Sequence, residues 1–214
     1  MQHDRTVLGW AKKSTRCPGS VTRLAAGGTD LLLIDVTEAK TARARLELQV
    51  MCFETGIDFV PTAPAQLFPE PAGVSRAITQ EREIAAMLDH FEGKGQLRLE
   101  IADAPVPTAQ TAAASGRDWL TRRKALYDTR IARKLRAKDV LDHLDLAEFD
   151  IKTRALATGV ERDILVPKKA LKRVLKHLRT SAEKIDTAMT LSVTGLWPPF
   201  SFVQPFCDSR TTWD

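Results

Sequence analysis

Two consecutive prolines near the C-terminus, Pro198 and Pro199, constrain the folding of this chain more than any other local feature. They fix φ at two positions and remove two backbone donors, so neither a helix nor a central strand continues through them. Trp197, which precedes them, is biased toward extended backbone. Upstream, residues 190–194 alternate apolar and hydroxyl side chains as a strand does. The sequence therefore predicts a strand, a break at Gly195 and a rigid aromatic-proline segment.

Residues 195–202 read Gly-Leu-Trp-Pro-Pro-Phe-Ser-Phe, and this segment resembles the closing motif of the gas vesicle protein GvpL/GvpF family. Members of that family typically carry Gly-Pro-Trp-Pro-Pro-Tyr-Ser-Phe, so six of the eight positions agree, with Leu196 in place of proline and Phe200 in place of tyrosine. The candidate structural or partner-contact motif consists of Trp197, Pro198, Pro199, Phe200 and Phe202.

Two roles are open for this motif. It can pack the C-terminal tail, residues 204–214, across the domains, or it can contribute to an exposed apolar patch that holds a hydrophobic client. The two prolines make the backbone rigid, and large apolar side chains follow them. We therefore favour the packing role over client binding.

Length and composition set the outer bounds of the fold. The chain has 214 residues, enough for two small domains, and its 43% hydrophobic and 28% charged residues are ordinary for a globular protein. Its apolar runs are far shorter than the roughly 20 residues that span a bilayer. The first residues lack the apolar stretch of a signal peptide, so a cytoplasmic location is expected. Three widely spaced cysteines indicate neither a disulfide framework nor a zinc site.

Residues 1–93 predict a mixed α+β domain that begins with strands. Residues 6–10, 20–24 and 30–36 have strand-like composition. Gly27-Gly28, between the last two, is typical of a hairpin turn and lacks the spacing of a phosphate-binding loop.

Helices are expected later in this domain. Asp35 and Glu38 have the spacing of a capping box and precede apolar residues at helical spacing, which end near Gly56. Four prolines at positions 61–71 predict extended or turn backbone there and argue against a helix. A further helix is expected to end at Gly93.

Residues 94–203 predict a second α+β domain. In chain order we expect a strand at 96–102, an Ala/Pro/Thr-rich connection at 103–116, a helix at 117–138, a shorter helix at 139–149, strands at 150–156 and 163–166, a helix from Pro167, and the strand at 190–194. Apart from the shorter helix, this is the split-βαβ order of a ferredoxin-like fold. The family resemblance implies the same class: two α+β domains, the second a modified ferredoxin-like fold with extra helices.

The two predicted helices at 117–149 differ in character. Leu120, Tyr127, Ile131 and Leu135 form one apolar stripe on the first helix. Asp139 is expected to be the N-cap of the second.

Charge is concentrated on particular segments, although the chain as a whole carries +5. Residues 117–138 hold nine Lys/Arg and two Asp, residues 168–184 hold seven Lys/Arg and one Glu, and residues 139–150 hold five carboxylates and no Lys/Arg. Such segments are typical of solvated helix faces, which we favour over nucleic-acid binding because no aromatic interleaving or RNA- or DNA-binding signature accompanies them. An acidic protein partner stays open.

Catalytic patterns are missing from the sequence. The four histidines have no metal-ligand spacing, and no nucleophile elbow surrounds any serine. We therefore expect no catalytic residues, no metal and no cofactor. The resemblance implies a non-enzymatic accessory or minor structural protein of gas vesicles, whose partners are the hydrophobic shell protein GvpA and other accessory proteins. The alternative is a basic ferredoxin-like module that binds nucleic acid or regulates another protein.

Overall fold

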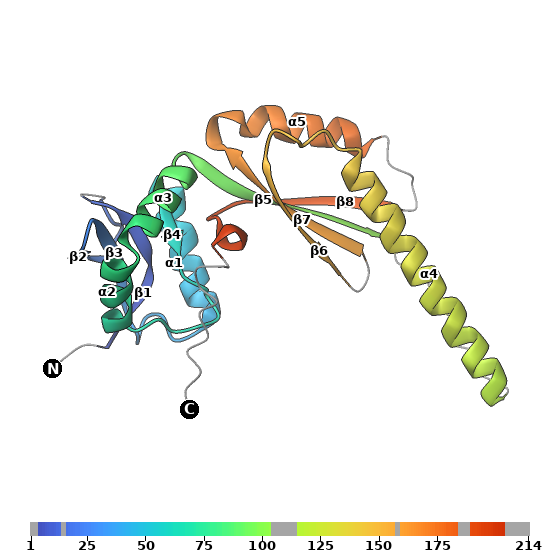
Figure 1. Ribbon diagram of the computed structural model, residues 1–214, viewed down its shortest axis with the longest axis horizontal. Coiled ribbons are helices and arrows are strands. Elements are labelled where there is room, and N and C mark those ends of the chain that lie inside the picture. The colour runs from blue at the N-terminus through green and yellow to red at the C-terminus, as the bar shows by residue number, and fades with distance from the viewer. Residues whose placement is uncertain (1–3, 14–15, 104–114, 157–158, 184–188, 204–214) are drawn as a thin grey trace. The chain divides into compact units, whose positions relative to one another are not determined.

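The computed structural model describes residues 4–13, 16–103, 115–156, 159–183 and 189–203 (Figure 1). These residues form two four-stranded antiparallel sheets with their helices, which confirms the predicted α+β class and is consistent with two domains. The predicted connection at 104–114 and the predicted tail at 204–214 lie outside the described residues.

The chain divides into two compact units. One consists of Met1–Gln96 together with Leu196–Asp214, and the other of Leu97–Gly195. The sequence interpretation put residues 94–203 into a single domain, whereas residues 196–203 group with the N-terminal unit. The chain therefore leaves the N-terminal unit after β5 has begun and returns to it as β8 ends.

The sheet of the N-terminal unit contains the predicted hairpin. Its strands lie in the order β2-β3-β1-β4, and β2 pairs with β3 so that Ala26 faces Thr29 across Gly27-Gly28. Gly27 has φ +58°, a conformation that favours glycine. The strands are β1 (Arg5–Lys12), β2 (Thr22–Ala26), β3 (Thr29–Asp35) and β4 (Phe59–Pro61).

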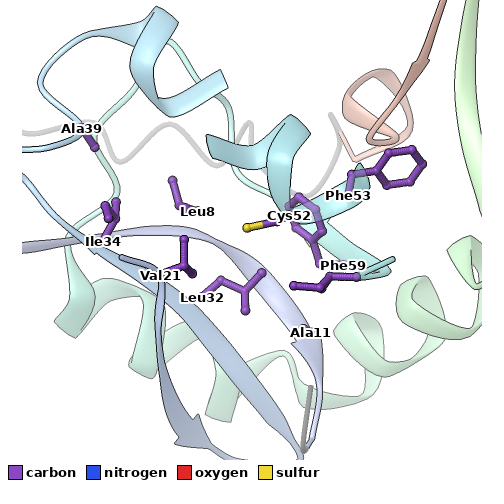
Figure 2. Close-up of a cluster of buried hydrophobic side chains, with 10 residues drawn as sticks. Leu8, Ala11, Val21, Leu32, Ile34, Ala39, Cys52, Phe53 and Phe59 are labelled. Atoms are coloured by element: carbon purple, nitrogen blue, oxygen red, sulfur yellow. The ribbon is translucent and has the colours of Figure 1, made fainter. Parts of the chain in front are cut away.

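Strands β1 and β3 are buried on both faces, which explains the continuous apolar run at residues 31–34. On one face, Leu8, Leu32 and Ile34 pack with Cys52 and Phe53 of helix α1 (Ala42–Glu54) in the cluster of Figure 2. This face holds one apolar core cluster of the unit.

The other face of the sheet is covered by α2 (Glu70–Thr79) and α3 (Glu81–Phe91). Gly73 of α2 lies so close that an added Cβ would fall 2.4 Å from a methyl group of Val7. Trp10, which is fully buried, donates its indole N–H to the Gly73 carbonyl over 3.4 Å. The absence of a side chain at Gly73 therefore allows α2 to approach the sheet this closely.

Two predictions in the N-terminal unit are wrong. Helix α1 is capped by Thr41, whose hydroxyl accepts the Ala44 N–H over 3.1 Å, and the Asp35 carboxylate instead accepts the Thr37 N–H in a tight turn. Helix α2 begins inside the proline-rich stretch, because Pro71 lies in its first turn, where a missing backbone donor costs nothing.

The second sheet has the strand order β6-β7-β5-β8. Figure 1 shows α5 lying across it, and α5 buries Val174 and Leu178. The elements are β5 (Lys94–Asp103), α4 (Gly116–Asp142), β6 (Asp150–Ala155), β7 (Gly159–Pro167), η1 (Lys168–Ala170), α5 (Leu171–Ala182), β8 (Met189–Trp197) and η2 (Phe200–Phe202).

Helix α4 is continuous where the sequence interpretation divided it at Asp139. The Asp139 carbonyl accepts the His143 N–H over 3.1 Å, as it does inside a helix, and the N-cap is Ser115. An aspartate inside a helix costs only about 0.7 kcal/mol relative to alanine, less than interrupting the ladder of hydrogen bonds. Likewise β8 does not stop at Gly195 but passes through it with φ +122° and ends at Trp197.

Candidate interaction surfaces

Residues 196–203 pack within the N-terminal unit, and we call them the docking segment. Pro198 and Pro199 are buried. Beyond them, the short helix η2 forms as Phe202 N–H donates to the Pro199 carbonyl over 3.0 Å. The prolines thus end the strand and start a compact turn.

A reciprocal pair of hydrogen bonds holds this turn. The Ser201 N–H donates to Gln96 Oε1 over 2.9 Å, and Gln96 Nε2 donates to Ser201 Oγ over 3.1 Å. Both residues are only 2% exposed. Because an unpaired buried amide is costly, the two bonds fix the place of the turn against the start of β5. The sequence analysis did not predict this contact. Ser201 is one of the six positions that agree with the family motif, whereas no pattern in the sequence marks Gln96.

Apolar packing adds to these hydrogen bonds. Leu196 packs against the core cluster that contains Phe53 and Cys52. An added Cβ on Gly95 would lie 2.5 Å from Leu196 and 2.7 Å from Phe53, so only glycine fits there. Val203 is 3% exposed at the end of the segment. The docking segment therefore completes the core of the N-terminal unit.

The five motif residues do not share one environment. Pro198 and Pro199 are buried, whereas Trp197, Phe200 and Phe202 are half-buried. The aromatic rings leave part of their surface accessible next to a rigid proline turn. Packing of the tail and contact with a hydrophobic client both stay predictions for this motif.

A second surface lies on α4, where the predicted apolar stripe is exposed rather than buried. Its large side chains are 40–65% exposed, and they are Trp119, Leu120, Leu126, Tyr127, Ile131 and Leu135. The Arg123 guanidinium stacks over the Trp119 ring at 4.9 Å from its centroid. The high density of Lys/Arg in residues 117–138 is the sequence signal that distinguishes such an uncovered helix from a core helix.

Among the described residues, the C-terminal end of α4 is fixed to its sheet. Leu141 is fully buried, and Arg162 of β7 donates to the Leu141 carbonyl and to Asp142 Oδ1, each over 2.6 Å. Lys138 and then Arg162 lower the pKa of the Asp142 carboxyl to about 2 through hydrogen bonds. Asp142 therefore stays ionised at neutral pH and holds the helix end.

No group of three or more His, Cys, Asp and Glu able to hold a metal occurs among the described residues. An open depression of about 740 Å³ includes Arg5 and Glu70, which form an ion pair at 2.7 Å. Burial raises the pKa of the Cys52 thiol to about 12, so this cysteine is a protonated core residue.

Comparisons with known proteins give a likeness of fold. No protein-family model and no curated protein matches the sequence. The crystal structure of the gas vesicle protein GvpF from Anabaena sp. PCC7120 superposes with a TM-score of 0.70 at 11% identity, over 95% of this chain and 97% of that one. GvpF from Microcystis aeruginosa gives a TM-score of 0.70 at 10% identity, over 95% and 100%.

The chain has the GvpF fold. The resemblance carried by residues 195–202 is thereby confirmed at the level of the fold, over nearly the whole length of both chains. No described helix is long and apolar enough to cross a membrane.

Proposed function

We propose that the protein is a non-enzymatic accessory or minor structural protein of gas vesicle assembly. The observation that carries this proposal is the fold shared with two GvpF structures over 95% of the chain. The Trp-Pro-Pro motif supports it independently, because it belongs to the same family of proteins. The proposed partners are the shell protein GvpA and other gas vesicle accessory proteins, and the proposed place is the cytoplasm and the gas vesicle.

We further propose that the second unit is a modified ferredoxin-like domain. Its elements follow in the order β5, α4, β6, β7, α5, β8, and its strands lie in the order β6-β7-β5-β8. This strand order brings the first and third strands of the unit together at the centre, which supports a split-βαβ fold. The 27-residue α4 is longer than the crossover needs and is the main addition.

The docking segment supplies a structural role within this function. Burial of Pro198 and Pro199 supports packing as its first role, and the half-buried Trp197, Phe200 and Phe202 are proposed as contacts for a hydrophobic partner. Aromatic side chains beside a rigid turn give large contact area at low entropic cost.

Co-expression with GvpA tests the proposal directly. A tagged full-length chain is expected to retain GvpA during purification, and removal of its gene from a vesicle-forming strain is expected to reduce vesicles, measured by pressure-sensitive light scattering. Trp197→Ala should weaken retention, while Leu67→Ala, an exposed leucine elsewhere on the same unit, should not. Unchanged vesicle formation without the gene, together with no retention of GvpA, would contradict the function.

The charge around α4 and α5 supports a second candidate function, nucleic-acid binding. Residues 117–138 carry nine Lys/Arg, and residues 168–184 carry seven. A basic ferredoxin-like module could bind nucleic acid through phosphate contacts, and such binding weakens steeply with salt. A gel shift with duplex DNA and with RNA at about 50 and 200 mM salt tests it. The absence of any shift at the lower salt concentration eliminates this alternative.

A further inference from the structure

The N-terminal part of α4 has no covering side chains from the described residues. Every side chain at positions 115–129 is exposed except Asp118, which is half-buried. Because these side chains are exposed, this part of the helix gains little stability from packing within the unit. Isolated helices of about 12–15 residues are only marginally stable in water. A partner that covers it would both bury apolar surface and stabilise the helix.

The exposed apolar side chains share one side of α4. At about 100° per residue they lie within one half of the helix circumference, and they extend over residues 119–135, or about 24 Å of helix. We call this surface the α4 face, with the members Trp119, Leu120, Leu126, Tyr127, Ile131 and Leu135. Spacings of seven and four residues recur among them, as they do where a helix contacts another helix.

Cations lie among these apolar side chains and define what the face can bind. Arg123 stacks on Trp119. Lys134, which lies between Ile131 and Leu135 in the sequence, falls in the same half of the helix. Charges within the apolar side make burial in lipid unfavourable, because membrane-surface helices keep Lys/Arg on the opposite side. Leucine and isoleucine in turn gain little from a phosphate backbone. An apolar ridge flanked by carboxylates satisfies both kinds of side chain at once.

We propose that the α4 face docks an acidic amphipathic helix of another protein. The partner helix presents Leu or Ile toward the α4 apolar side chains and Glu or Asp toward Arg123 and Lys134. Pairing with a second copy is disfavoured, since residues 117–138 carry nine Lys/Arg against two Asp in each copy. The inference depends on α4 alone and goes beyond the gas vesicle role.

A matched pair of synthetic peptides tests this proposal with the full-length protein. Each has three heptads with Leu at the a and d positions, and the flanking positions are Glu in one peptide and Lys in the other. Fluorescence anisotropy of the labelled peptides measures Kd. The acidic peptide is expected to bind at least about tenfold more tightly than the basic one, and its binding should weaken as salt increases.

Substitutions on α4 then locate the site. Leu126→Ala with Tyr127→Ala should raise Kd for the acidic peptide roughly tenfold, and Arg123→Glu should do so by a similar factor. Thr129→Ala, on the opposite side of the same helix, is the matched control and should leave Kd unchanged. Circular dichroism verifies that the helix content of each variant is retained.

Three results would overturn the proposal. One is that the acidic peptide does not bind, that it binds no more tightly than the basic peptide, or that the α4 substitutions do not change its binding. Another is that duplex DNA or anionic phosphatidylserine vesicles bind in a way that depends on the α4 face while the acidic peptide does not bind. The third is a dimer in analytical ultracentrifugation that the Leu126→Ala, Tyr127→Ala variant dissociates, which assigns the face to a second copy.

Discussion

At the scale of single residues, the docking segment depends on one side-chain amide. Gln96 accepts from the Ser201 N–H and donates to its hydroxyl, in a site that is 2% exposed. Gln96 lies near the start of β5, and its side-chain amide contacts Ser201 of η2. One residue therefore links segments that are 105 positions apart in the sequence.

We predict that Gln96→Leu lowers the free energy of unfolding by roughly 1–3 kcal/mol, because it removes both hydrogen bonds to a buried turn. Chemical denaturation measures this loss, and limited proteolysis should show earlier cleavage near residues 196–203. Gln66→Leu, at an exposed position, is the control and should change stability by less than about 0.5 kcal/mol. Equal effects of the two substitutions would contradict the role of Gln96.

Cys52 gives a pH dependence whose sign is fixed by its environment. Burial, and secondarily the neighbouring Cys17, raise the pKa of its thiol from 9.0 to about 12. The unfolded chain releases this proton near pH 9 while the folded chain keeps it. The stabilising contribution is thus complete below pH 9 and is lost progressively between pH 9 and about pH 12.

We predict that the stability advantage of the parent protein over Cys52→Ala is smaller at about pH 10.5 than at about pH 8, by roughly 1–2 kcal/mol. Urea denaturation of both proteins at the two pH values measures it, and the comparison cancels other groups that titrate in both. An advantage that stays constant or grows with pH would show that the thiol is not desolvated in the native core.

At the scale of elements, α4 combines two environments in one helix. Its C-terminal end is packed on β7 through Leu141 and Arg162, and its N-terminal part is exposed. Apolar residues at helical spacing occur in both parts. Periodicity alone does not distinguish them, because burial depends on what other elements lie nearby.

Two leucines on α4 test this difference. We predict that Leu141→Ala, at a fully buried position, costs about 2–5 kcal/mol of unfolding free energy through the lost contacts and the cavity. Leu135→Ala, at a position 63% exposed, should cost less than about 0.5 kcal/mol. Thermal or urea denaturation measures both. A large loss for Leu135→Ala in the isolated protein would mean that the α4 face is already covered.

At the scale of the whole molecule, the N-terminal unit is discontinuous in sequence. Met1–Gln96 forms most of it, and residues 196–203 complete its core from the other end of the chain. The GvpF structures share this fold over almost their entire length. The docking segment is therefore part of the unit's architecture and not an appendage.

We predict that a chain that ends at Gly195 is less stable than a chain that ends at Val203, by roughly 3 kcal/mol or more. The shorter chain loses the buried side chains of Pro198, Pro199 and Val203, each a substantial apolar contribution. Equilibrium unfolding followed by far-ultraviolet circular dichroism measures the difference. Equal stability would show that residues 196–203 add nothing to the core.

The sequence by itself determined the α+β class, the hairpin at Gly27-Gly28, the order of the strands in the second unit, and the resemblance carried by Trp197-Pro198-Pro199. These depend on local backbone preferences and periodicity, which neighbouring residues encode. The tertiary structure alone decided that Gln96 holds Ser201, that α2 begins at Glu70 with Pro71 in its first turn, and that Leu196 packs against the core of the N-terminal unit. Those outcomes depend on which distant elements supply hydrogen-bond partners and cover, and no local pattern in the chain records them.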